Sequence, residues 1–254
     1  MPTRRKPSHA SGTRAPFDPD AALRTLAKRF REIGSPERAE HEKAYMKSAL
    51  RFHGVTSPQV VDAVRELLAA HTPPTRDQIH ALVDAAYASG WFDLRSAALS
   101  VMGRRVNALE PDDLPWLVDL VRRSGCWAHV DWIAPKMLGD VLGRHPELLG
   151  PRLREWAKDP DFWVRRAALL SQLDSLRRGA GDFALFAEIA GPMVVERELF
   201  IRKAIGWILR EVSKKRPELA FAFLRDHRAK VAGLTLREGA KYLPADMRLG
   251  LGLS

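Results

Sequence analysis

Apolar positions along the chain recur with a period close to 3.6 residues, and no alternating strand pattern or hairpin signal appears. Helix starts are marked by a proline at or near the first helical position, where its missing N–H and fixed φ do no harm. These starts are Asp18-Pro19, Ser35-Pro36, Ser57-Pro58, Pro111-Asp112-Asp113, His145-Pro146 and Arg216-Pro217. Thr72-Pro73-Pro74 predicts a rigid break between helices. We therefore predict an all-α chain of about a dozen helices.

Four segments of the chain, 91–104, 125–138, 161–174 and 198–211, can be laid over one another. They share a position occupied in turn by Ala97, Asp131, Ala167 and Ala204, at intervals of 34, 36 and 37 residues. Repetition at this spacing is typical of stacked helical pairs, each too thin to bury its own apolar face. The pattern predicts a curved α-solenoid of about six stacked helical pairs.

Asp131 stands where the neighbouring repeats carry alanine, and a carboxylate there costs stability unless it is paired or has a task. Trp127 lies one turn earlier, about 40° away on the helical wheel. Carried across the repeats, Arg166 falls about 100° and Trp207 about 60° from the Asp131 direction, on the side of Trp127. We expect the four side chains to line one wall of a groove. The alternative is a structural arrangement, with the indoles in the core and Asp131 paired with a nearby arginine.

Two basic pairs, Arg165-Arg166 and Arg202-Lys203, occupy matching positions in successive repeats. They suit either a ladder that binds phosphates or a merely solvated face. The whole chain has 41 Lys and Arg against 31 Asp and Glu, a net charge of +10 and a pI near 10.1. Such an excess favours a polyanionic partner, although an arginine-rich solvated surface would give the same balance.

Composition also sets limits on location and chemistry. The single Cys126 excludes an internal disulfide and a cysteine metal cage, and points to a reducing cytoplasm. No apolar run reaches the roughly 18 residues of a membrane span. The histidines are scattered, and no phosphate loop or nucleophile elbow is present. We expect no metal, no cofactor and no membrane association, and a monomeric cytoplasmic protein.

The ends of the chain differ in composition from its middle. The first sixteen residues lack acids and carry several basic residues among Pro, Ser and Gly, while the end after Pro244 is rich in Gly. We predict a disordered basic tail at 1–17, a repeat domain at 18–243 and a C-terminal tail at 244–254. An organelle-targeting segment is the alternative for the first of these.

Four stretches together resemble a known family, the AlkD-like DNA alkylation-repair glycosylases, which are built from HEAT-like repeats. The stretches are Pro36-Glu37-Arg38-Ala39-Glu40 running to Ala44-Tyr45-Met46-Lys47, Cys126-Trp127-Ala128-His129-Val130-Asp131, Trp163-Val164-Arg165-Arg166-Ala167-Ala168, and Phe200-Ile201-Arg202-Lys203-Ala204-Ile205-Gly206-Trp207-Ile208-Leu209-Arg210-Glu211. The likeness spans roughly residues 20 to 240. It departs from the family at Phe52-His53-Gly54, at Thr56 and at Cys126.

The resemblance implies roles for residues at matching positions. Asp131 would be the catalytic acid, Trp127 its partner on the same helix, Arg166 the phosphate-facing arginine and Trp207 the second indole of the groove. Further DNA contacts are expected from Tyr45, Lys47, Arg165, Arg202 and Lys203.

The function expected from the resemblance is excision of cationic N3- or N7-alkylated purines from duplex DNA, without base flipping. The alternative is a non-catalytic HEAT-like repeat protein that binds structured DNA or a protein partner.

Overall fold

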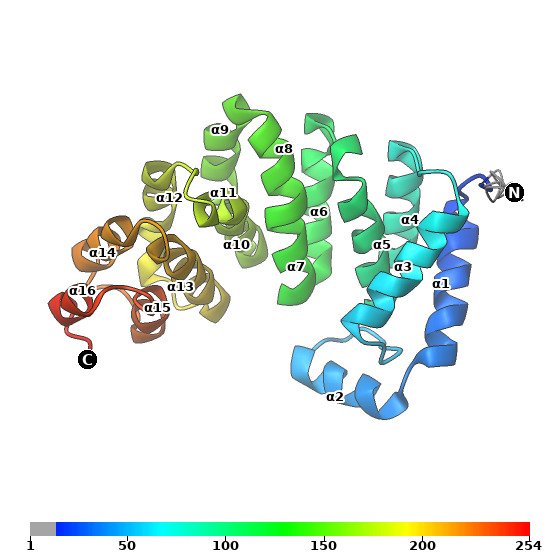
Figure 1. Ribbon diagram of the computed structural model, residues 1–254, viewed down its shortest axis with the longest axis horizontal. Helices are drawn as coiled ribbons and strands as arrows, with labels where there is room; N and C mark the ends of the chain where they lie inside the picture. Colours follow the sequence, from blue (N-terminus) through cyan, green and yellow to red (C-terminus); the bar gives the residue numbers. More distant parts are fainter. Residues whose placement is uncertain (1–13) are drawn as a thin grey trace, which may run out of the picture. The chain divides into compact units, whose positions relative to one another are not determined.

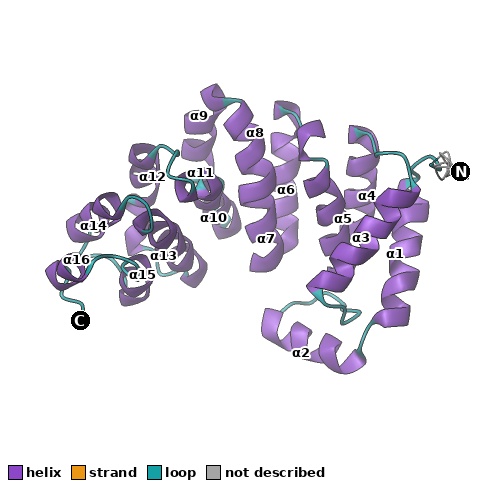
Figure 2. Cartoon of the chain, viewed as in Figure 1, coloured by secondary structure: helices purple, strands orange, loops and turns teal. Residues whose placement is uncertain are grey.

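The computed structural model describes residues 14–254, which are built from helices and loops (Figures 1 and 2). Within these residues the only β pairing is two isolated bridges, so the predicted all-α class is confirmed. The described chain divides into two compact units. Unit 1 comprises residues 14–45 and 49–102, and unit 2 comprises residues 46–48 and 103–254.

Unit 1 holds the first helices of the chain. Their bounds are α1 (Pro19–Ile33), α2 (Pro36–Met46), α3 (Ser57–Ala70), α4 (Arg76–Ala88) and α5 (Phe92–Arg104), the last two residues of α5 falling in unit 2. Helix α1 packs against α3 and α4, and buries Leu26 and Phe30. Helix α2 differs from the others because none of its residues is buried.

Unit 2 holds the remaining helices. Their bounds are η1 (Val106–Ala108), η2 (Pro111–Asp113), α6 (Leu114–Ser124), α7 (Trp127–Ile133), the π-helical η3 (Ala134–Leu138), α8 (Gly139–Arg144), α9 (Pro146–Trp156), α10 (Phe162–Leu170), α11 (Leu173–Arg177), α12 (Phe183–Ala190), η4 (Pro192–Val195), α13 (Leu199–Ser213), α14 (Pro217–Asp226), α15 (Gly233–Gly239) and α16 (Ala245–Gly250). The predicted proline starts are confirmed at α1, α2, α3, η2, α9 and α14.

The four superposable segments each contain one helix: α5, α7, α10 and α13. Their shared alanines, Ala97, Ala167 and Ala204, are all buried, as expected for a position where neighbouring helices approach closely. Helix α10 packs against both α7 and α13. Helix α13 makes its most extensive contact with α15. Gly206 allows this close approach, because a Cβ there would lie only 3.0 Å from Cβ of Glu238. This packing determines which faces of α7, α10 and α13 remain uncovered and could form a site.

Both predicted tail boundaries need correction. Residues 1–13 lie outside the described part of the chain, but Phe17 is buried, and Ala15 exchanges backbone hydrogen bonds of 3.2 and 2.8 Å with Ala70 and Thr72. At the other end, 244–254 contains α16, and Leu251 is buried with its carbonyl accepting from Arg228 Nε at 2.8 Å. Apolar side chains at both ends therefore extend the packed fold beyond 18–243.

Candidate active site

Asp131 is positioned by α7, a helix that begins at Trp127 and buries His129, Val130 and Ile133. These buried residues set the rotation of the helix and leave Asp131 on its partly exposed side. Three residues after Asp131, at Ala134, the chain widens into the π-helical η3. Pro135 explains this change, because it lacks the N–H that would donate to the Asp131 carbonyl in an α-helix.

The Asp131 carboxylate forms a two-pronged ion pair with Arg166 of α10. Nε of Arg166 lies 2.8 Å from Oδ1, and Nη2 lies 2.8 Å from Oδ2. The third nitrogen, Nη1, donates to the backbone carbonyl of Phe200 on α13. One guanidinium therefore joins three successive repeats, and the parallel geometry fixes the orientation of the carboxylate.

The two partners differ in their access to solvent. The Arg166 side chain is 4% exposed, whereas that of Asp131 is 16% exposed. A carboxylate oxygen has two lone pairs, and Arg166 occupies one on each oxygen. The carboxylate is therefore held from the interior and still offers acceptor capacity at the surface.

The phosphate-facing role expected of Arg166 stays a prediction, and in this structure Arg166 is engaged within the protein. Its three nitrogens are bonded to Asp131 and Phe200, and the side chain is buried. The pairing of Asp131 with an arginine, which the sequence left open as the structural alternative, is what the structure contains. The carboxylate's exposure distinguishes the pair from a fully internal one.

The indoles of Trp127 and Trp207 are half-buried, unlike those of Trp156 and Trp163, which lie in the core. Trp127 precedes Asp131 by one turn of α7 and shares its face. On α13, Trp207 follows Phe200 by seven residues and lies on the same helical stripe. Arg166 Cζ is 5.8 Å from the Phe200 ring centroid. The indoles of Trp127 and Trp207 are therefore less enclosed than those of Trp156 and Trp163.

The expected DNA-binding residues fall into two groups, those that bond within the protein and those that are exposed. Arg165 pairs with Glu196 at 2.9 Å, and Arg202 Nε donates to the Glu196 carbonyl at 2.8 Å, so both brace the segment before α13. Lys203 is exposed, with Nζ 5.8 Å from the Phe200 ring centroid. In and after α2, Tyr45 is 66% exposed, and the exposed Lys47 has a left-handed φ of 48°.

Sequence reasoning missed one feature of the site, an aromatic at the same repeat position in three successive units. Trp127, Trp163 and Phe200 are spaced 36 and 37 residues apart, as the shared alanine position is. The ring centroids of Trp163 and Phe200 lie 4.8 Å apart. The spacing itself was the signal that could have found this repeated aromatic position.

Metal and membrane features were also sought in residues 14–254. There, no three His, Cys, Asp or Glu side chains gather in a way that would bind a metal ion. None of the helices described combines the length and apolar character needed to cross a bilayer.

Comparison with known proteins adds an independent line of evidence. A family model described as DNA alkylation repair enzyme matches residues 26–243. A solved structure of a predicted DNA alkylation repair enzyme from Enterococcus faecalis is 26% identical, with a TM-score of 0.72, over 84% of this chain and 97% of that one. AlkD2 from Streptococcus mutans, at 16% identity and a TM-score of 0.63 over 90% and 100%, shares the fold. No curated protein matches the sequence significantly.

Proposed function

The chain belongs to the DNA alkylation repair enzyme family, and from that premise we propose that it hydrolyses the N-glycosidic bond of cationic N3- or N7-alkylated purines in duplex DNA. The observation that carries the proposal is the Asp131 carboxylate. It is fixed at both oxygens by a buried arginine and yet is partly open to solvent. Such rigidity suits a group that must act on a charge appearing outside the protein.

Hydrolysis of this N-glycosidic bond needs little assistance from the protein to the departing base. Alkylation gives the purine a positive charge, so the base departs as a neutral molecule without a strong general acid. As the bond breaks, the deoxyribose acquires oxocarbenium character, as in other glycoside hydrolysis. The demand on the enzyme is therefore stabilisation of a cationic sugar and delivery of water.

Asp131 is the residue suited to both tasks. Its negative charge would stabilise the developing cation, and its outward lone pairs would position or deprotonate the attacking water. Arg166 acts through Asp131 and is a positioning residue, because it holds the carboxylate and does not reach the surface. The orientation of the acid is thereby set before DNA arrives.

The half-buried indoles would bind beside the acid. An electron-rich π face attracts a cation, so Trp127 and Trp207 would pack on the sugar and its backbone. Lys203 would contact a phosphate, and Tyr45 the lesion-bearing strand. Contacts of this kind grip the backbone, and we propose that the damaged base stays stacked during excision.

The test is release of base by the purified protein. Wild-type protein incubated with methylated duplex should release 7-methylguanine or 3-methyladenine, measured by chromatography under single-turnover conditions. Asp131→Asn should lower the rate constant roughly 100- to 1000-fold, the range for loss of one preorganised electrostatic group. Duplex affinity should be kept, because Asn retains an acceptor for Arg166.

Asp62→Asn is the matched control, since Asp62 is an exposed acid of α3 whose side chain is paired with Arg65 at 2.9 Å. It should release base as the wild type does. Normal release by Asp131→Asn would remove the proposed role of this residue.

A second candidate function is favoured by the ion pair itself. A carboxylate partly neutralised by Arg166 is also what a non-catalytic repeat protein would use to join its repeats. That protein would bind structured DNA or a protein partner. Wild-type protein that shifts duplex DNA in a salt-dependent manner but releases no methylated base would support this reading.

A further inference from the structure

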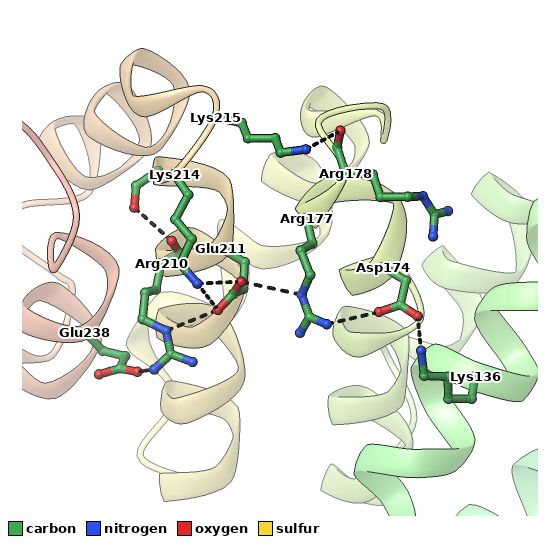
Figure 3. Close-up of polar contacts among 10 residues, drawn as sticks. Lys136, Asp174, Arg177, Arg178, Arg210, Glu211, Lys214, Lys215 and Glu238 are labelled. Carbon is green, nitrogen blue, oxygen red and sulfur yellow. Dashed lines mark hydrogen bonds and ion pairs between the residues drawn. The ribbon is translucent and has the colours of Figure 1, made fainter.

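A second surface of unit 2 carries a concentration of positive charge that the proposed reaction does not use. Arg177 and Arg178 end and follow α11, and Lys214 and Lys215 follow α13 at the matching repeat positions, 37 residues later. Nζ of Lys215 donates to the carbonyl of Arg178 at 3.4 Å, so the two segments lie side by side (Figure 3). Four basic residues from two successive repeats therefore lie on neighbouring segments of the unit.

An exposed tyrosine extends this edge. Tyr242, just after α15, is 50% exposed. Nζ of Lys214 lies 5.0 Å from its ring centroid, and Nζ of Lys241 lies 5.7 Å from it. Nζ of Lys214 also donates to both carboxylate oxygens of Glu211, at 3.0 and 2.9 Å. The ring therefore has two ammonium groups within cation–π distance, one of them also paired with an acid. Because half of the Tyr242 side chain is exposed, it contributes little to the stability of the fold. Its hydroxyl and the two neighbouring ammonium groups are available at the surface.

The acids in contact with this region do not neutralise it. Arg177 lies between Asp174 and Glu211, and Arg210 between Glu211 and Glu238 (Figure 3). The connected cations are Lys136, Arg177, Arg178, Arg210, Lys214, Lys215 and Lys241, against the carboxylates Asp174, Glu211 and Glu238. A surplus of four positive charges on so few helices attracts a polyanion.

The pKa of Glu211 reflects the positive charge of its neighbours. Burial raises the pKa of Glu211, but the hydrogen bond and charge of Lys214, the charge of Arg177 and the hydrogen bond from Arg210 together hold that pKa below its usual value. The carboxylate is thus fully ionised at neutral pH, and its neighbours still carry the excess.

The edge is continuous with the candidate active site along α13. Lys214 follows Trp207 by seven residues, which places it about 10 Å further along the helix and within about 20° of the same stripe. A nucleic-acid strand that passes the indole of Trp207 and continues along this helix would reach Lys214 and then Tyr242. The spacing corresponds to about three base pairs of duplex, at 3.4 Å each.

We propose that Lys214, Lys241 and Tyr242 form a binding site for the phosphodiester backbone of duplex DNA, about three base pairs to one side of the nucleotide at Trp207. This inference rests on the proposed function for the placement of the DNA. The two ammonium groups would neutralise phosphates, and the tyrosine hydroxyl would donate to a phosphate oxygen. The site sets where the flanking duplex lies and takes no part in bond cleavage.

The experiment measures binding of the full-length chain to duplex DNA by fluorescence anisotropy over a range of salt concentrations. Lys214→Gln/Lys241→Gln should weaken binding roughly fivefold or more per lysine at 0.1 M salt, and should reduce the slope of log K against log salt by about two. Tyr242→Phe, which removes only the hydroxyl, should weaken binding by a smaller factor. The matched control is Lys28→Gln/Lys230→Gln, which removes two exposed lysines elsewhere and should bind as wild type.

Duplex length gives the second arm of the test. Two short duplexes are compared, with the damaged nucleotide two base pairs from one end or two base pairs from the other. One of them lacks the flanking base pairs that would reach the proposed site, so on that duplex the Lys214→Gln/Lys241→Gln variant and wild type should bind with equal affinity. An unchanged affinity and slope on long duplex would overturn the proposal, and would leave an acidic protein as the occupant of this surface. Because binding is the readout, this result is separate from the base-release result that decides the proposed function.

Discussion

Asp93 on α5 and Asp131 on α7 both accept hydrogen bonds inside the protein, but they differ in partner and in exposure. Oδ2 of Asp93 accepts from the backbone N–H of His53 at 2.6 Å and lies 3.3 Å from its ring Nδ1, and the side chain is 3% exposed. The His53 ring stacks on Trp91 at 3.9 Å. Asp93 thus fixes the segment before α3 within unit 1 and is sealed from solvent.

Asp131 is bonded just as firmly, but by a side chain of opposite charge and with its outer edge open. The comparison shows that a paired carboxylate is not in itself a sign of structure or of function. Access to solvent separates the two acids. Substitutions that remove each pairing should therefore affect stability and activity in different proportions.

The largest effect on stability is expected from Arg166→Ala. It removes the side-chain donor to the Phe200 carbonyl and leaves Asp131 without its partner, and breaking a buried ion pair typically costs about 3–5 kcal/mol. Urea unfolding should show this loss, and Arg166→Lys a smaller one. Since Arg166 is buried, the salt slope of DNA binding by the folded variant should equal that of wild type. A slope lowered by about one with stability unchanged would support the phosphate-facing role instead.

A smaller effect is expected from Asp93→Ala. It leaves the buried N–H of His53 without an acceptor, which costs about 1–3 kcal/mol. Asp93→Asn keeps an acceptor oxygen and should cost less. Thermal unfolding measures the loss. The base-release rate of the folded Asp93→Ala protein should match wild type, and a release defect comparable to that of Asp131→Asn would end the distinction between the two acids.

The repeat pattern explains how much of this could be predicted from the sequence. Ala97, Ala167 and Ala204 identified a close-packed position, and that periodicity is enough to single out Asp131 and to suggest Arg166 as its partner. The burial of Arg166 was not predictable, because a helical wheel gives the direction of a side chain and not whether a neighbouring helix covers it. The ends were missed for the same reason. Phe17 and Leu251 are single apolar residues whose burial depends on distant helices.

Tyr242 and Lys241 also escaped prediction, since no repeat aligns them with α13. Their proximity to Lys214 arises from the close approach of α15 to α13 at Gly206. A contact between helices of different repeats carries no periodic signal, so only the folded chain reveals it.

The smallest effect is expected at Glu211, which contrasts with Asp131 in having three cationic neighbours, Arg177, Arg210 and Lys214. Its pKa is lower in the folded protein than the ordinary 4.5, so it binds a proton less readily when folded than when unfolded. Its stabilisation is therefore present above about pH 4.5 and is lost as the pH falls through the folded pKa. Glu211→Gln should lower the unfolding free energy at pH 7 by less than about 1 kcal/mol, because solvent screens the exposed partners.

The gap between wild type and Glu211→Gln should close in urea titrations repeated at successively lower pH, as the wild-type carboxylate becomes protonated below its folded pKa. The control is Glu188→Gln. The pKa of Glu188 is lowered by its hydrogen bond from Arg154, but both side chains are about half exposed, so the substitution should give no measurable change at either pH. A gap that stays constant between neutral and acid pH would mean that the three cations do not act on Glu211, and the surplus charge assigned to that surface would then have to lie elsewhere.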